Sequence, residues 1–172
     1  MPRNIEIKAR LADAAVQTAL AAELSGEDGV IIEQEDVFFP CRQGRLKLRI
    51  LAPDHGELIF YHRPDQAGPK TSTYGISRTT EPDQLRLVLG QSLGEGAVVR
   101  KTRRLFMVGR TRVHLDAVEG LGDFLELEVV LDDDEVTDSG EREAADLMAR
   151  LQVPVTALVE GAYVDLLADI DT

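Results

Sequence analysis

The sequence predicts an α+β fold in which seven or eight antiparallel strands form a sheet, with helices packed on its outside. Three observations lead to this prediction. Apolar and polar residues alternate over many short stretches, which is the pattern of half-buried strands. Turns rich in glycine and proline separate these stretches, and four segments have helical character. A sheet of this size usually closes into a barrel or packs as a sandwich, and the pattern does not distinguish the two.

The first part of the chain contains two strands and a helix. Residues 3–10 alternate between apolar side chains on one face and polar or charged side chains on the other. Asp13 can cap the helix that follows, an Ala- and Leu-rich run that extends to about Leu24. Residues 30–39 form a second extended stretch, which Pro40 closes.

A hairpin is predicted next. Residues 44–52 alternate again, with basic side chains on one face and aliphatic side chains on the other. The segment Asp54-His55-Gly56 predicts the hairpin turn, and residues 57–63 predict the return strand, which Pro64 ends. After a loop, residues 71–78 predict another short strand.

The second half contains three more strands between helices. A helix is expected from Glu81-Pro82-Asp83 to about Leu93, because proline suits the first helical position. Three strands follow, over residues 97–108, 110–118 and 123–131. Ser139 is expected to cap a third helix that ends near Leu151, and a last helix is expected over residues 156–167.

Composition and charge narrow the class of protein. With 172 residues, 44% of them hydrophobic, the chain can bury a core and is expected to be neither disordered nor membrane-spanning. It contains no internal repeat or linker, so residues 1–172 are expected to form one domain. A net charge of −12 disfavours nucleic acid and anionic membranes as partners. The single cysteine, Cys41, and the lack of a signal peptide make the cytoplasm the expected compartment.

The polar faces of the predicted strands contain the candidate functional residues. Their charged and ionisable side chains are Glu6, Lys8, Arg45, Lys47, Arg49, Lys101, Arg103, Arg112, His114, Asp116, Glu126 and Glu128. If the sheet closes with its helices outside, these groups face a lumen, where each unpaired charge costs several kcal/mol. A divalent cation such as Mg2+ or Mn2+ would satisfy the carboxylates, and a polyphosphate would satisfy the basic groups. An open sheet with this face in water is the alternative, and the pattern alone does not exclude it.

Five segments resemble the CYTH superfamily, which includes class IV adenylate cyclases, thiamine triphosphatases and inorganic triphosphatases. Residues 4–8, Asn-Ile-Glu-Ile-Lys, are similar to the family's Glu-x-Glu-x-Lys signature. Residues 45–49 and 101–103 resemble its two basic strands. Residues 114–128 resemble its late segment, in which an aspartate precedes a Gly-x-Gly-x-Phe turn and a Glu-x-Glu pair, and are closest to the class IV cyclase version. Residues 163–167 resemble its C-terminal helix, so the matches span nearly the whole chain in the family's order.

The resemblance implies a closed, eight-stranded antiparallel β-barrel with helices outside, whose tunnel binds a triphosphate together with Mg2+ or Mn2+. The implied metal ligands are Glu6, Asp116, Glu126 and Glu128. The implied triphosphate-binding residues are Lys8, Arg45, Lys47, Arg49, His62, Lys101, Arg103 and Arg112. Lys8 and Glu126 are also the implied catalytic residues. Asp116 either orients a cation or binds the metal indirectly, and His62 or Lys70 stands in for a lysine that family members often have before a proline.

One departure from the family affects the expected function. Asn4 stands where the family has its first glutamate, and its uncharged side chain implies weaker metal binding or a different number of metals. The expected function is metal-dependent hydrolysis of inorganic triphosphate or a nucleoside triphosphate. The alternative is conversion of ATP to cyclic AMP and pyrophosphate, and a third is triphosphate binding without catalysis. Members are often dimers, so a homodimer is a further expectation, although no apolar patch in the sequence indicates one.

Overall fold

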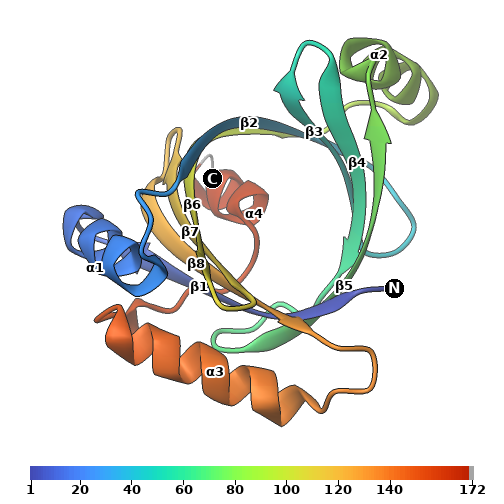
Figure 1. Ribbon diagram of the computed structural model, residues 1–172. Coiled ribbons are helices and arrows are strands. Elements are labelled where there is room, and N and C mark those ends of the chain that lie inside the picture. The colour runs from blue at the N-terminus through green and yellow to red at the C-terminus, as the bar shows by residue number, and fades with distance from the viewer. Residues whose placement is uncertain (171–172) are drawn as a thin grey trace.

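Eight strands form a closed antiparallel barrel in the computed structural model, which describes residues 1–170 (Figure 1). The strands are β1 (Arg3–Leu11), β2 (Val30–Phe39), β3 (Arg45–Ala52), β4 (His55–His62), β5 (Lys70–Thr79), β6 (Val98–Val108), β7 (Thr111–Val118) and β8 (Gly122–Leu131). Their order around the ring is β1-β5-β4-β3-β2-β6-β7-β8, so β1 pairs with both β5 and β8. The closed eight-stranded barrel is therefore confirmed, and the sandwich and the open sheet are excluded.

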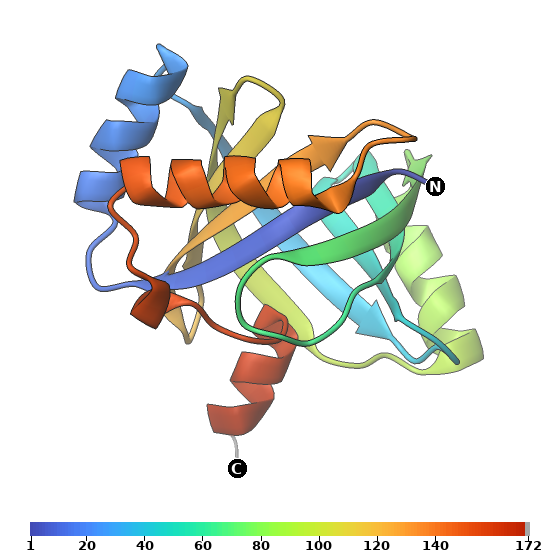
Figure 2. The ribbon, with the colours of Figure 1, turned by 90° about the horizontal axis from the view of Figure 1, so that it is seen from below.

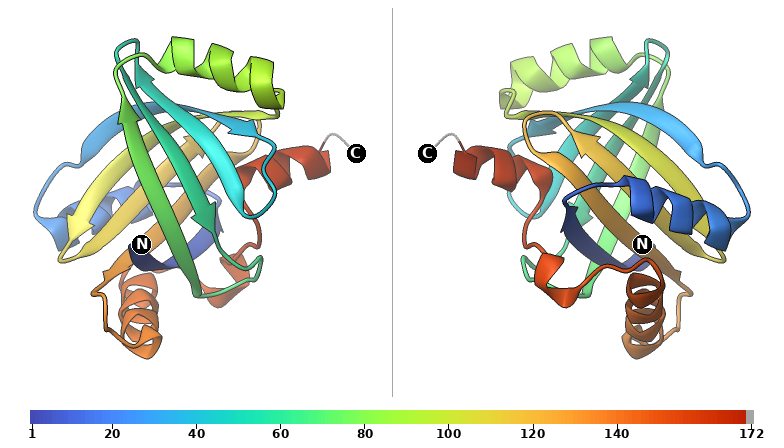
Figure 3. Two further views of the ribbon diagram at one scale, coloured as in Figure 1. Left: turned by 90° about the vertical axis from the view of Figure 1, so that its right-hand side faces the viewer. Right: turned by 90° about the vertical axis from the view of Figure 1, so that its left-hand side faces the viewer.

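Helices cover the outside of the barrel and one of its ends. They are α1 (Ala15–Ser25), α2 (Pro82–Leu93), α3 (Thr137–Arg150), a short 3-10 helix η1 (Val155–Ala157) and α4 (Tyr163–Ile170). Helix α3 packs on β1 and β8, α1 on β6 and β7, and α2 on β2, β3 and β4 (Figures 1 and 2). Helix α4 projects from one end of the barrel (Figure 3). No helix among residues 1–170 has both the length and the apolar character needed to cross a membrane.

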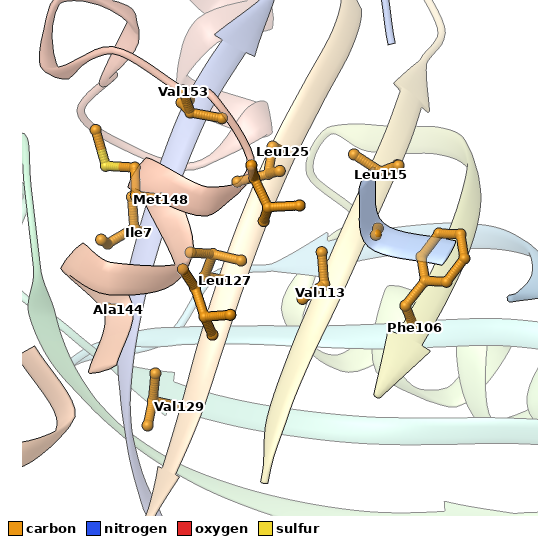
Figure 4. Close-up of a cluster of buried hydrophobic side chains, with 14 of the residues drawn as sticks. Ile7, Phe106, Val113, Leu115, Leu125, Leu127, Val129, Ala144, Met148 and Val153 are labelled. Atoms are coloured by element: carbon orange, nitrogen blue, oxygen red, sulfur yellow. The ribbon is translucent and has the colours of Figure 1, made fainter. Parts of the chain in front are cut away.

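The main hydrophobic core lies between the outer face of the barrel and the helices. Ile7 of β1 and Leu127 of β8 are almost fully buried and pack with Ala144 and Met148 of α3 (Figure 4). Because side chains alternate along a strand, this outer apolar face leaves the inner face to polar and charged residues. The packing outside the barrel thus determines which residues line its lumen.

Two predicted helix boundaries are wrong. Ser139 does not cap the third helix, because α3 already begins at Thr137. The helix predicted over residues 156–167 is interrupted, since Leu158 pairs with Ala9 as an isolated bridge and the Val159 N–H donates to the Lys8 carbonyl at 3.0 Å. These contacts occupy the edge of β1 beyond the point where β5 pairs with it. The extended segment thereby continues the wall of the barrel before α4 begins.

The predicted strands and first cap need smaller corrections. The hairpin turn is shorter than Asp54-His55-Gly56, because β4 already begins at His55. At α1, the N-cap residue is Ala14 and not Asp13, so the predicted cap is wrong, and the carboxylate of Asp13 instead accepts the Ala15 N–H at 2.9 Å. The remaining predicted strands agree with the structure to within one residue at each end.

Close packing of α3 against the barrel gives a first testable prediction. A Cβ at Gly140 would lie 2.7 Å from side-chain atoms of both Ile5 and Leu131, which are buried. Gly140→Ala should therefore lower the free energy of unfolding by about 1–2 kcal/mol, because overpacking outweighs the gain in helix propensity. Gly90→Ala in α2 is the matched control, since nothing lies closer than 3.9 Å. It should be neutral or stabilising by up to about 1 kcal/mol in urea unfolding, and equal effects of the two changes would contradict the prediction.

Candidate functional site

The lumen of the barrel contains a cavity of about 440 Å3, to which all eight strands contribute side chains. Among the described residues that line it, eight are lysine or arginine and five are aspartate or glutamate, an excess of three positive charges. The whole chain has a net charge of −12, so the cavity has the opposite sign to the protein. An enclosed, positively charged cavity favours a multiply charged anion as its ligand. A second, more open cavity of about 670 Å3 shares the lining residues Gln34, Leu51 and Lys101 with the lumen cavity. Of the residues predicted for the site, only Lys101 lines this second cavity.

Most of the residues predicted for the site do line this cavity. They are Glu6, Lys8, Lys47, Arg49, Lys101, Arg103, Arg112, Glu126 and Glu128. Three others lie elsewhere. Arg45 is near one end of the barrel, where it donates to the Asp165 carboxylate of α4 at 2.6 Å. His62 is exposed on the outer face of β4, and Asp116 lies behind Arg103, buried but outside the cavity lining.

Three carboxylates meet where β1 and β8 pair. Glu6 lies directly opposite Glu128, and Lys8 lies opposite Glu126. Burial and the negative charge of Glu128 raise the pKa of Glu6. Burial would also raise the pKa of Glu126, but the positive charges of Lys8 and Arg103 outweigh it and hold that pKa well below its usual range. Glu126 is thus an ionised carboxylate at neutral pH inside a largely buried cluster.

This cluster fits a divalent cation. One ring nitrogen of His114 and one carboxylate oxygen each of Glu126 and Glu128 lie within 4.8 Å of one another. The Nδ1 atom of His114 is buried and has no hydrogen-bond partner among the described residues. Oxygen-rich donor sets of this kind bind Mg2+ and Mn2+, and the cation would also relieve the repulsion between Glu6 and Glu128.

The sequence interpretation missed Asp36 of β2, which is 2% exposed and organises three cations of the cavity. Its carboxylate accepts hydrogen bonds from Lys47 at 2.8 Å and from Arg49 at 2.8 and 2.9 Å, and it lies 3.6 Å from Lys101. Burial would raise the pKa of Asp36, but these cations hold it well below its usual range. The alternation of Ile32, Gln34 and Asp36 on the lumen face was the available signal, and the apolar residues after Asp36 obscured it.

Arg63 was also missed. It directly precedes Pro64, which is where the family resemblance leads one to look for a lysine, and it lines the cavity, whereas the neighbouring His62 points outward. Its guanidinium donates to Glu6 at 2.5 Å and to the Gly161 carbonyl at 3.3 Å. Arg63 therefore links the carboxylate cluster to the C-terminal segment, and the alternation of side chains explains why it, and not His62, does so.

The start of α4 forms one wall of the cavity. The Tyr163 hydroxyl donates to Asp116 at 2.8 Å, and the same carboxylate accepts two hydrogen bonds from Arg103, each at 2.7 Å. Lys8 lies 4.0 Å above the Tyr163 ring and donates to the Gly161 carbonyl at 3.2 Å. These contacts fix the positions of two cations, Lys8 and Arg103, before any ligand binds.

Comparison with known proteins agrees with this geometry. The family model of the CYTH domain matches residues 2–163. Adenylate cyclase CyaB of Aeromonas hydrophila is 28% identical, over 93% of this chain and 86% of that protein. The solved PH1012 protein of Pyrococcus horikoshii superposes with a TM-score of 0.79 at 22% identity, covering 95% of this chain and 98% of that one. The Schizosaccharomyces pombe RNA triphosphatase Pct1 superposes with a TM-score of 0.50 at 12% identity, covering 99% and 83%.

Proposed function

Because the chain belongs to the CYTH domain family, we propose that it is an enzyme that cleaves a triphosphate inside its barrel with the help of a divalent cation. The reaction that we propose first is hydrolysis of inorganic triphosphate or a nucleoside triphosphate. A single observation carries the proposal: a surplus of basic side chains and a cluster of carboxylates share one enclosed cavity. A triphosphate with its metal ion has the complementary charges.

The carboxylate side of the cavity would hold the cation. Glu6, Glu126 and Glu128 are the proposed ligands for Mg2+ or Mn2+. When bound, such a cation neutralises charge on phosphate oxygens and makes water more acidic. Arg63 and Arg112 already pair with Glu6 and Glu128, at 2.5 and 2.7 Å, so they orient these carboxylates. These arginines also lie where they could reach phosphate oxygens next to the cation.

The basic side of the cavity would hold the phosphates. Lys47, Arg49 and Lys101 share the single carboxylate of Asp36, which leaves most of their hydrogen-bond donors available to an incoming anion. Arg103 is held rigidly by Asp116, which we assign as a positioning residue for that cation. Catalysis of phosphoryl transfer rests mainly on such alignment and charge neutralisation. Lys8 is the basic group nearest Glu126, 3.8 Å away, and would neutralise charge that develops beside the cation.

Cyclisation of ATP is the second candidate, and two observations favour it. The relative from Aeromonas hydrophila is named an adenylate cyclase. In addition, the apolar side chains of Ile32, Leu51, Ile59, Ile76 and Leu105 line parts of the same cavity, which suits a nucleoside better than a purely inorganic substrate. In this reaction the ribose 3′-hydroxyl attacks the α-phosphorus and pyrophosphate leaves.

A product assay tests the proposal. The purified protein is incubated with tripolyphosphate or ATP in the presence of Mg2+ or Mn2+, and EDTA serves as the control. Released orthophosphate supports hydrolysis, and equal amounts of cyclic AMP and pyrophosphate from ATP support cyclisation. Binding without turnover would instead support a triphosphate-binding module, the reading that Asn4 motivates. If the protein neither binds nor converts either compound, the proposed function is wrong.

A further inference from the structure

We infer that His114 is a ligand of the divalent cation, and that the site therefore prefers a transition-metal ion such as Mn2+ or Co2+ to Mg2+. This inference rests on the proposed function, because it concerns the cation that the carboxylate cluster would hold. It concerns a residue for which neither the sequence pattern nor the family resemblance implies a metal role.

The first support is the place of His114 in the sheet. It lies on β7 directly opposite Glu126 of β8, and its neighbour on the same face, Arg112, lies opposite Glu128. Residues directly opposite in an antiparallel pair project side by side, so the imidazole faces the cavity next to these two carboxylates. Their ligand atoms, within 4.8 Å of one another, are close enough to share one ion.

The second support is the unused hydrogen-bonding capacity of the imidazole. His114 is 3% exposed, and its Nδ1 has no partner among residues 1–170. A buried polar atom without a partner is costly, and native structures seldom retain one without a reason. By contrast, Asp116 on the same strand has both of its oxygens engaged by Arg103 and Tyr163. Nδ1 is thus not engaged by another described residue, and a metal ion held with the carboxylates would engage the imidazole through one ring nitrogen.

The donor chemistry then determines which ion is preferred. Mg2+ binds almost only to oxygen and keeps several of its waters, whereas imidazole nitrogen is a good ligand for the later divalent ions. Manganese accepts both carboxylate oxygen and imidazole nitrogen. One nitrogen together with two or three carboxylates therefore favours Mn2+ and Co2+ over Mg2+.

Metal binding to the purified, metal-free protein tests this inference without an activity assay. Calorimetric titration should give at least about ten-fold tighter binding of Mn2+ than of Mg2+ to the wild type. His114→Phe, which keeps a ring but removes the donor, should weaken Mn2+ binding at least about ten-fold and leave Mg2+ binding within about three-fold. His55→Phe, at an exposed position on β4, is the matched control and should change neither affinity.

Pulsed electron paramagnetic resonance of Mn2+ bound to the wild type gives an independent test that needs no variant. A hyperfine coupling to a nitrogen nucleus is expected, and it should disappear in His114→Phe and in the smaller His114→Gln. Tight Mn2+ binding without nitrogen coupling would overturn the inference and leave the proposed function intact. If the wild type binds no divalent cation, both fail.

Discussion

Replacing Glu126 by glutamine is expected to lower kcat/KM for triphosphate cleavage by about a thousand-fold, equal to about 4 kcal/mol of transition-state stabilisation. Glutamine keeps the size of the side chain but removes the negative charge. Glu126 lies opposite both His114 and Lys8 in the sheet, so this charge stands at the centre of the cluster. The measurement is the initial rate with saturating Mn2+, together with Mn2+ affinity from titration of the same preparation.

The control for this change is Glu119→Gln, which removes a carboxylate from the exposed turn between β7 and β8. Its kcat/KM should match that of the wild type. A Glu126→Gln enzyme with near-normal turnover and unchanged Mn2+ affinity would show that Glu126 is not a ligand of a catalytic metal. If only the Mn2+ affinity fell, with full activity restored at high Mn2+, the carboxylate would contribute to binding of the cation but not to the chemistry.

Asp36→Asn should have the largest effect on stability, because it leaves the buried Lys101 and the partly buried Lys47 and Arg49 without their shared partner. Removing one member of a buried ion pair typically costs about 3–5 kcal/mol, and urea unfolding of the metal-free protein should show a loss of this size. The pKa of Asp36 is lower in the folded state than in the unfolded state. Its contribution is therefore complete above about pH 5 and declines as the pH falls, so the difference from the wild type should shrink in acid.

Tripolyphosphate should partly restore the stability of Asp36→Asn. Lys47, Arg49 and Lys101 would then pair with phosphate oxygens instead of Asp36. The midpoint of thermal unfolding should thus rise more on adding tripolyphosphate for the variant than for the wild type. Glu33→Gln, an exposed change on the same strand, should unfold and respond like the wild type. An equal response of Asp36→Asn and wild type would mean that these cations do not bind the anion.

The strands of the barrel could be predicted because the side chains on their outer face are apolar and those on their inner face are polar or charged. Along β1, Ile5 and Ile7 pack outward while Glu6 and Lys8 point inward, and this alternation is visible in the sequence. Closure itself could not be read from the alternation, because an open sheet has the same period. The prediction of a closed barrel came from the family resemblance. The predicted last helix failed near its start for a different reason, since the free edge of β1 recruits Leu158 through a contact between residues far apart in the chain.

Site residues could be predicted on strands whose lumen face is regularly charged, and they were missed on strands whose lumen face is mostly uncharged. Arg49 and Arg103 lie on strands with regular alternation, and the sequence indicated both. Asp36 lies on a strand whose lumen face is otherwise uncharged, so a single acid beside Ile32, Gln34 and Phe38 gave little signal. Arg63 was overlooked because it lies one residue beyond the end of β4, although the alternation from Tyr61 places it on the lumen face. Ion pairs between residues far apart in the sequence, such as Arg63 with Glu6, are not encoded in any local sequence pattern.

The pairing of β1 with β8 also has a consequence for biosynthesis. Arg3 pairs with Leu131, so the first and last strands meet only after nearly the whole barrel sequence has left the ribosome. Contacts so distant in sequence form slowly, since the ends of a long chain must first find each other. The acidic residues on the two strands, Glu6, Glu126 and Glu128, stay apart until that moment. A nascent or truncated chain that lacks β8 therefore cannot assemble the cluster, and metal uptake by the finished protein would report that the ring has closed.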